Sequence, residues 1–155
     1  MNQDADAAEL QQVVSQIEAA MEMVPFARWL GLRFTEIEGD RVSIDFDMRP
    51  EFVGNPYKQA LHGGIISSVL DTVGGFAAIL GLMTRVLEGG DEALASSWVG
   101  TIDMRTDFLR PGVGDRFTAF AFPLRVGRRL VVTRMELHGE GGELIAVGTG
   151  TYVVP

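Results

Sequence analysis

The sequence of 155 residues contains no cysteine, which excludes disulfide bonds and zinc sites built from thiolates. It has a single lysine, Lys58, among thirteen basic residues, and its formal net charge is −8. Because neutralising the phosphates of nucleic acid needs an excess of basic residues, binding to nucleic acid is not expected. The missing cysteines fit a reducing compartment, and the acidic residues 1–6 do not resemble a secretory signal. We therefore expect a cytoplasmic protein.

Only one apolar stretch, from Gly64 to Met83, is long enough to cross a bilayer. It carries Asp71 near its centre, and a central aspartate costs roughly 2.5–3.5 kcal/mol on membrane insertion scales. Neither an aromatic belt nor a basic flank accompanies the stretch. The prediction is a core helix and no association with a membrane.

The first half of the chain predicts one surface helix and two strands. Residues 7–24 carry apolar residues at helical spacing and predict an amphipathic helix that packs on a sheet or a partner and ends before Pro25. Leu32–Glu38 and Arg41–Met48 predict two strands joined by a turn at Gly39-Asp40. Residues 49–61 are expected to form a loop.

The second half predicts a buried helix followed by strands. The helix runs from His62 to about Met83 and has no polar face, so it must be enclosed on nearly all sides. A loop is expected over about Arg85–Ala93. Four strands follow at Ser96–Phe108, Arg116–Val126, Leu130–Gly139 and Glu143–Val153. Their short connections indicate antiparallel hairpins.

An antiparallel sheet must cover its apolar face, and the buried helix is the element that matches it. The expected fold class is therefore α+β, with an antiparallel sheet wrapped around one long central hydrophobic helix. This arrangement is the hotdog fold. The expected organisation is an N-terminal amphipathic helix over residues 1–24 and a hotdog domain over residues 25–155.

His62-Gly63-Gly64 lies where the loop becomes the buried helix. Free backbone N–H groups and the positive end of the helix dipole meet at such a helix start. The glycines let a ligand approach closely, so this end can stabilise an oxyanion. The alternative reading is a tight turn before a packed helix.

Asp71 lies inside an apolar segment with little polar company. Because burying an unpaired carboxylate is costly, such a residue usually has a chemical task or a dedicated partner. A carboxylate that points into solvent, or one that pairs with an arginine across an interface, is the structural alternative.

The spacing between Gly63 and Asp71 bears on assembly. Eight helical steps separate them by about 12 Å. One reacting atom cannot contact both, because reacting groups must lie within about 3–3.5 Å. If both act on one substrate, they come from different subunits, and two helices running antiparallel across a two-fold axis create two such sites.

These motifs resemble those of hotdog acyl-CoA thioesterases of the PaaI-like (phenylacetyl-CoA thioesterase) type. The similarity rests on Gly54-Asn55, Leu61-His62-Gly63-Gly64 and Leu70-Asp71, with the nine-residue step from His62 to Asp71. Thr101-Ile102-Asp103-Met104 and Phe108-Leu109-Arg110-Pro111-Gly112 resemble two further motifs of the family. The resemblance covers roughly residues 25–155, and the N-terminal helix is a variable addition.

The resemblance implies hydrolysis of an acyl-CoA, aryl-acetyl or medium-chain, to acid and free CoA. It implies a homodimer or homotetramer, and no cofactor or metal, since CoA belongs to the substrate. It gives Asp71 the role of nucleophile or general base, and the Gly63 N–H, with Gly64 nearby, the thioester oxygen. His62 and Asn55 would orient the loop or the attacking water, and Thr101 would assist that water.

Coenzyme A carries phosphates, so arginines are expected at the mouth of the site. The candidates are Arg105, Arg110, Arg128 and Arg129, each of which has ordinary solvated arginine as its alternative. For the acyl slot the candidates are Phe76, Ile79, Leu80 and Met83, each with plain core packing as its alternative.

Two rival functions remain open. An enoyl-CoA hydratase of the same fold typically pairs an aspartate with a histidine a few positions later, and no histidine follows Asp71 on the predicted helix. The other rival is a non-catalytic acyl-CoA-binding protein. Such a regulator would be expected to carry a DNA-binding segment, and the acidic N-terminal helix does not resemble one.

Overall fold

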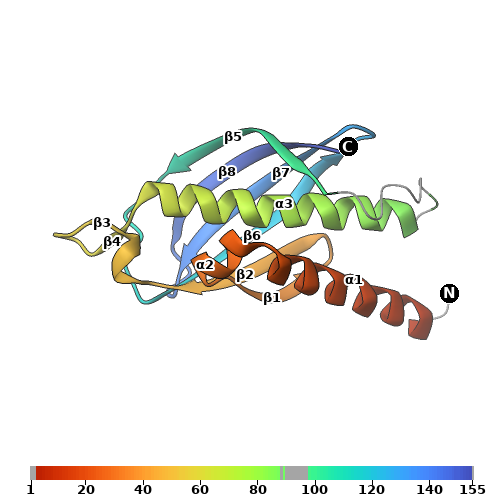
Figure 1. Ribbon diagram of the computed structural model, residues 1–155, viewed down its shortest axis with the longest axis horizontal. Coiled ribbons are helices and arrows are strands. Elements are labelled where there is room, and N and C mark those ends of the chain that lie inside the picture. The colour runs from red at the N-terminus through yellow and green to blue at the C-terminus, as the bar shows by residue number, and fades with distance from the viewer. Residues whose placement is uncertain (1–2, 88, 90–97, 155) are drawn as a thin grey trace.

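The computed structural model describes residues 3–87, 89 and 98–154, which form a main antiparallel sheet with helices on one face and a small two-stranded hairpin (Figure 1). The helices are α1 (Gln3–Met23), α2 (Pro25–Leu30) and α3 (Gly63–Leu87), with a 3-10 turn at Pro50–Phe52. The strands are β1 (Arg33–Glu38), β2 (Arg41–Asp47), β3 (Val53–Asn55), β4 (Ala60–Leu61), β5 (Gly100–Phe108), β6 (Arg116–Val126), β7 (Leu130–Gly139) and β8 (Leu144–Val153).

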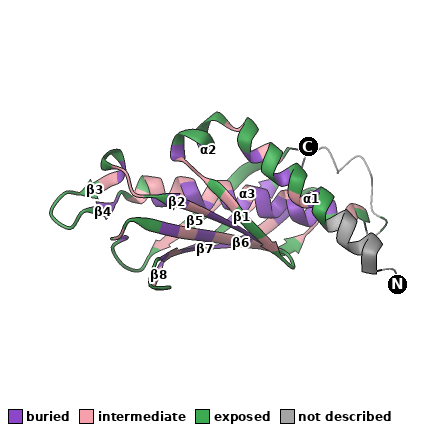
Figure 2. Cartoon of the chain, turned by 90° about the horizontal axis from the view of Figure 1, so that it is seen from below, coloured by how far each residue is buried: buried purple, intermediate pink, exposed green. Residues whose placement is uncertain are grey.

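The main sheet has six strands in the order β1-β2-β6-β7-β8-β5, and all neighbours are antiparallel. It curves around α3, which runs along its concave face (Figure 1). Figure 2 shows that α3 is largely buried and that the β3–β4 hairpin projects from the molecule with an exposed surface. These features match the predicted α+β architecture with one central hydrophobic helix.

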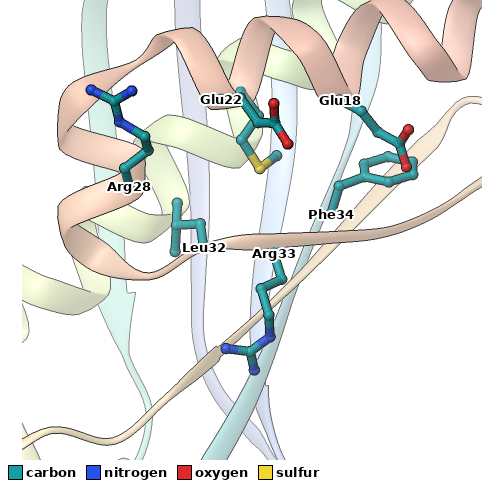
Figure 3. Close-up of a pocket in the computed structure, with 7 residues that line it drawn as sticks. Glu18, Glu22, Arg28, Leu32, Arg33 and Phe34 are labelled. Atoms are coloured by element: carbon teal, nitrogen blue, oxygen red, sulfur yellow. The ribbon is translucent and has the colours of Figure 1, made fainter.

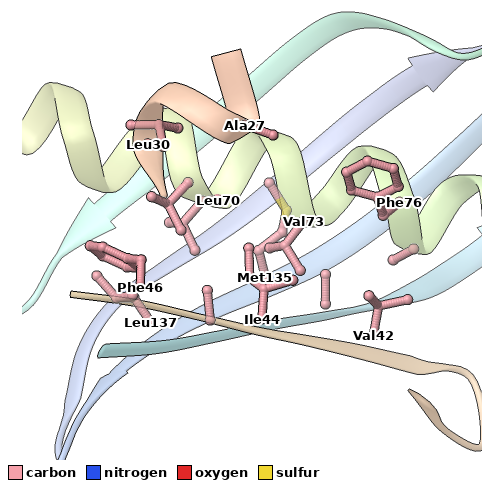
Figure 4. Packing of buried hydrophobic residues seen from close by; sticks show 14 of the residues in the cluster. Ala27, Leu30, Val42, Ile44, Phe46, Leu70, Val73, Phe76, Met135 and Leu137 are labelled. Carbon is pink, nitrogen blue, oxygen red and sulfur yellow. The ribbon is translucent and has the colours of Figure 1, made fainter. Parts of the chain in front are cut away.

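The core lies between α3, the sheet and the two N-terminal helices (Figure 4). Leu70, Val73 and Phe76 of α3 are buried, because residues three and four apart share one face of a helix. They belong to one cluster with side chains of α2, β2 and β7: Ala27, Leu30, Val42, Ile44, Phe46, Met135 and Leu137. Val42, Ile44 and Phe46 of the second strand are buried as expected, but Ser43, expected on the solvent-facing side, is buried as well.

The N-terminal helix α1 contributes to this same core. Val13, Ile17 and Met21 are buried in the cluster that contains the α3 side chains. In Figure 1, α1 runs alongside α3 and the β1–β2 side of the sheet. Helix α1 lies outside the residues that resemble the family, yet it packs against the central helix α3.

Helix α3 is apolar and long enough to cross a membrane, but 61% of its most apolar window is buried inside the protein. That degree of burial is typical of a core helix. It ends at Leu87, four residues beyond the expected end, because Thr84–Leu87 continue the helix until the residues rich in glycine and glutamate begin. Part of the expected 85–93 loop and the start of the expected 96–108 strand lie outside the described residues, and Trp98 and Val99 precede β5.

The predicted hairpin between the strands ending at Phe108 and beginning at Arg116 is wrong. β5 pairs with β8, and β6 pairs with β2 and β7, so residues 109–115 cross from one side of the sheet to the other. Three strand spacings of about 4.8 Å separate β5 from β6, which makes about 14 Å. Seven residues span up to about 24 Å when extended, so a short connection is enough for the crossing.

Two further differences concern short elements. Residues 49–61, expected to be a loop, contain the 3-10 turn and the β3–β4 hairpin. Helix α2 was not predicted; it begins at Pro25 and ends at Gly31, whose φ of 70° is the left-handed conformation that glycine adopts easily. Proline at the first helical position and glycine after the last are typical helix boundary signals.

Candidate active site

Asp71 lies on the partly exposed face of α3 and receives hydrogen bonds from two strands. The Thr101 hydroxyl donates to Oδ1 of Asp71 at 2.8 Å. The Tyr152 hydroxyl lies 3.2 Å from the same Oδ1 and 3.0 Å from the main-chain oxygen of Asp71. The predicted catalytic carboxylate thus has dedicated polar partners, and one of them is the predicted Thr101.

The partners of Asp71 are brought together by strand register. Thr101 of β5 and Tyr152 of β8 are direct cross-strand neighbours, so their side chains emerge on the same face of the sheet. A register shift between Thr101 and Asp103 marks an irregularity in β5 at this point. A β-bulge is one such irregularity, and bulges re-aim side chains and occur often beside active sites.

Tyr152 is almost completely buried, at 1% exposure. Burial raises the pKa of its phenol above the ordinary range, and the charge of Asp71 and the hydrogen bond to it raise that pKa further. The phenol therefore remains a proton donor at neutral pH. Sequence reasoning missed this residue, because nothing in the local sequence of β8 shows which residue of β5 lies opposite it.

A cavity of about 240 Å³ opens beside Asp71. Besides Asp71, Thr101 and Tyr152, its lining is mainly apolar and comes from α3, the start of α2 with the residue before it, and the two residues before β5: Val24, Phe26, Thr72, Gly75, Phe76, Ile79, Trp98 and Val99. Phe76 and Ile79, two of the expected acyl-slot residues, are in this lining. Leu80 and Met83 are buried and do not line the cavity.

The start of α3 is shaped by His62. Nδ1 of His62 accepts a hydrogen bond from the Gly64 N–H at 2.8 Å, and the His62 N–H donates to the main-chain oxygen of Phe52. Within the described part of the chain, no acceptor is bonded to the Gly63 N–H. Of the two glycines, Gly63 therefore offers the available donor for an oxyanion.

The segment before His62 is held by β3 and by the crossing connection. Leu61 donates its N–H to the oxygen of Gly112 at 2.9 Å. Gly54 lies so close to His62 that an added Cβ would meet the His62 Cα at 2.5 Å, so only glycine fits there. The backbone of the expected motif thus fixes the position of His62.

The Asn55 side chain serves the hairpin itself. Its Oδ1 accepts hydrogen bonds from the N–H groups of Tyr57 and Lys58, each at 3.1 Å. This contact shapes the loop, which is one of the two roles expected for Asn55. A role in positioning water stays a prediction.

The structure does not bring Gly63 and Asp71 together within one chain. They occupy the same continuous helix, eight residues apart, which corresponds to about 12 Å. Each chain therefore holds the predicted oxyanion donor and the predicted catalytic carboxylate at two separate places.

The four candidate arginines are exposed and divide into two groups. Arg105 and Arg110 belong to β5 and the connection after it, where the Phe108 ring packs over Gly63. Arg105 also pairs with Asp107 at 2.9 Å. Arg128 and Arg129 lie in the β6–β7 turn, and the Arg129 oxygen accepts a hydrogen bond from Val154, two residues after Tyr152.

A second cavity, of about 360 Å³, lies between α1, α2 and β1 (Figure 3). Its polar lining consists of two glutamates and two arginines, with Met21, Leu32 and Phe34 beside them: Glu18, Glu22, Arg28 and Arg33. None of the predicted catalytic residues lines it. The smaller cavity beside Asp71 is therefore the candidate active site.

Comparisons with known proteins identify the family of the chain. The family model described as the thioesterase superfamily matches residues 58–146. The medium/long-chain acyl-CoA thioesterase YigI of Escherichia coli is 41% identical over 133 residues, which cover 84% of this chain and 86% of the relative.

Two solved structures are similar. A protein from Shewanella oneidensis related to the thioesterase superfamily is 42% identical, with a TM-score of 0.79 over 96% of this chain and 97% of that one. The Escherichia coli PaaI protein from the phenylacetic acid degradation operon is 22% identical, with a TM-score of 0.76 over 94% and 96% of the two chains, and shows the shared fold. The predicted hotdog fold is confirmed, and the chain belongs to the thioesterase superfamily.

Proposed function

We propose that the protein hydrolyses acyl-CoA thioesters to a free acid and CoA. The observation that carries this proposal is the Asp71 carboxylate, held by Thr101 and Tyr152 at the edge of a mainly apolar cavity. Such a cavity suits an acyl chain, and the carboxylate lies where the carbonyl end of that chain would be. The relative YigI is a medium/long-chain acyl-CoA thioesterase, which favours aliphatic chains of that range over aryl-acetyl groups.

Two chemical routes fit the carboxylate. As a general base, Asp71 takes a proton from water, the water oxygen bonds to the thioester carbon, the C–S bond breaks, and the CoA thiolate receives the proton. As a nucleophile, a carboxylate oxygen attacks the carbon and expels CoA thiolate, and water then hydrolyses the mixed anhydride. Both routes use water and side chains alone, so the proposal includes no metal or cofactor.

The negative charge that develops on the thioester oxygen needs a donor near the reacting carbon. The Gly63 N–H is the available donor, but its own chain places it about 12 Å of helix away from Asp71. We therefore assign this donor to the partner subunit of a homodimer, within a dimer or a dimer of dimers. The site is then complete only in the oligomer, and the expected location is the cytoplasm.

The phosphates of CoA would be bound by arginine. In the shared site the thioester meets the partner's Gly63, and Phe108, two residues before Arg110, packs over Gly63 in its own chain. Arg110 is thus favoured over Arg128 and Arg129 as the phosphate ligand.

Arg110→Gln is expected to raise KM several-fold with little change in kcat, since a phosphate contact is remote from the reacting carbon. Steady-state kinetics with Arg128→Gln as the matched control tests this, and a larger KM effect at Arg128 would contradict it.

Release of free thiol from a panel of acyl-CoAs tests the proposed activity, with chains from short to long and phenylacetyl-CoA included. Asp71→Asn is the decisive variant, because its amide oxygen can still accept both hydrogen bonds while it loses the charge. We expect its kcat to fall at least about 100-fold without a change in oligomeric state. If the wild type turns over none of the panel, or if the variant retains full activity, the proposal is wrong, and saturable binding without turnover would indicate an acyl-CoA-binding protein.

A further inference from the structure

Tyr152 presents a buried hydroxyl among mainly apolar side chains, with the buried Thr133 hydroxyl beside it. Its ring packs with Ala78, Leu82, Val131 and Val154, and the whole side chain is 1% exposed. Burying a hydroxyl without a hydrogen-bond partner costs free energy, so the Tyr152 O–H is expected to point at an acceptor within reach. Both acceptors that it reaches belong to Asp71.

Helix α3 leaves room for this hydroxyl at Gly74, one turn after Asp71. A Cβ at Gly74 would collide with the Tyr152 hydroxyl oxygen and would also lie 3.1 Å from the Thr133 hydroxyl and from Cγ of Met135. Glycine within a helix costs about 1 kcal/mol relative to alanine. The close approach of the phenol to the helix therefore depends on a residue that the helix alone does not favour.

Both hydroxyls that contact the Asp71 carboxylate reach the same oxygen. Thr101 and Tyr152 lie 2.8 and 3.2 Å from Oδ1, from adjacent strands in direct register. The single phenol proton of Tyr152 is shared between Oδ1 and the main-chain oxygen of Asp71 at 3.0 Å, so Tyr152 ties the carboxylate to the backbone of its own helix. Among the described residues, none is hydrogen-bonded to Oδ2, and Asp71 lines the cavity.

We propose that Tyr152 is a positioning residue that, together with Thr101, holds Oδ1 of Asp71 and leaves Oδ2 as the oxygen that reacts. This inference rests on the proposed thioesterase function and assigns that function's reacting atom. Tyr152 does not exchange a proton in the reaction. It fixes the angle of the carboxylate, because displacement of a reacting group by about 1 Å can cost up to about 100-fold in rate.

Tyr152→Phe removes the hydroxyl and keeps the ring. With a panel substrate that the wild type hydrolyses, we expect kcat to fall about tenfold while KM changes by less than about twofold, the pattern of an interaction needed in the transition state. Tyr57→Phe, the same change at a side chain that is 98% exposed on the β3–β4 hairpin, is the matched control and should keep the wild-type constants.

Two more variants separate positioning from a general loss of structure. Gly74→Ala keeps Tyr152 but displaces its hydroxyl, and the same fall in kcat is expected; if this variant does not fold, Tyr152→Phe still decides. Thr101→Val combined with Tyr152→Phe should lose less than the product of the two single losses, because both donors hold one oxygen.

The possible outcomes are distinct. Wild-type kcat in Tyr152→Phe, a change confined to KM, or a crystal structure of the variant with the Asp71 carboxylate in its original orientation would each overturn the positioning role. Strictly multiplicative losses in the double variant would contradict the shared oxygen. A wild type that hydrolyses no acyl-CoA instead refutes the thioesterase proposal and, with it, this inference.

Discussion

The carboxylate of Asp71 lies between an apolar helix and two strands, and its oxygens have different surroundings. The sequence predicted the residue, because a lone aspartate inside an apolar helix needs an explanation and His62-Gly63-Gly64 lies nine residues before it. The sequence did not predict Tyr152. Its contact depends on the register of β5 against β8, and local sequence does not contain that register.

The buried phenol of Tyr152 also predicts a dependence of stability on alkaline pH. The pKa of this phenol in the folded protein is raised above the ordinary value of 10.0. At a pH above 10.0 but below the folded-state pKa, the folded protein therefore keeps a proton that the unfolded chain has lost. This contribution to stability is complete below pH 10 and decreases above it, by up to about 1.4 kcal/mol per pH unit. In Tyr152→Phe this component of the alkaline decrease should be absent.

Urea unfolding of the wild type and of Tyr152→Phe between about pH 8 and 11 measures the effect. At pH 8 the variant should be less stable by about 0.5–1.5 kcal/mol, the usual contribution of a hydrogen bond. Above pH 10 the two free energies of unfolding should converge, whereas Tyr57→Phe should follow the wild type. Parallel curves for the wild type and Tyr152→Phe would contradict the burial of the phenol as described.

At the scale of elements, periodicity identified the helices and strands whose burial is regular. The inward apolar residues of Arg41–Asp47 and the mainly apolar sequence of α3 each indicate how the element is enclosed. The position of β5 at the edge of the sheet, beside β8, could not be predicted from the length of the connection between β5 and β6. Residues 109–115 are few enough to suggest a hairpin but long enough to cross the sheet. Helix α2 was missed because six residues are too few to establish a period.

Helix α1 provides an element-scale prediction. Ile17 is fully buried in the common core, so Ile17→Ala should lower the free energy of unfolding by about 2–5 kcal/mol through lost burial and a cavity. Gln16→Ala, one residue earlier on the exposed side, should change it by less than about 0.5 kcal/mol. Urea unfolding at one fixed protein concentration gives both values. Similar small effects would mean that α1 is not part of the cooperative unit.

At the scale of the whole molecule, the proposal that Gly63 and Asp71 act on one substrate requires a second copy of the chain. Testing this needs a variant that removes the oxyanion donor alone. Gly63 is the first residue of α3, a position where proline is well tolerated because its missing N–H has no partner in the helix. Gly63→Pro therefore removes the Gly63 N–H with limited cost to the helix, although the ring must fit beside the exposed Phe108 side chain.

Gly63→Pro and Asp71→Asn should each be nearly inactive alone and should restore activity when their subunits are exchanged. In a mixed dimer one site carries both defects, and the other combines the intact Gly63 of one chain with the intact Asp71 of its partner. Random exchange makes half of the dimers mixed, each with one of two sites intact, so about a quarter of wild-type activity is expected. Thiol release after the subunits are dissociated and reassociated measures it, with each variant treated alone as the control. If the exchange is verified by mass and no activity returns, both groups act within one chain or not at all, and the shared site is wrong.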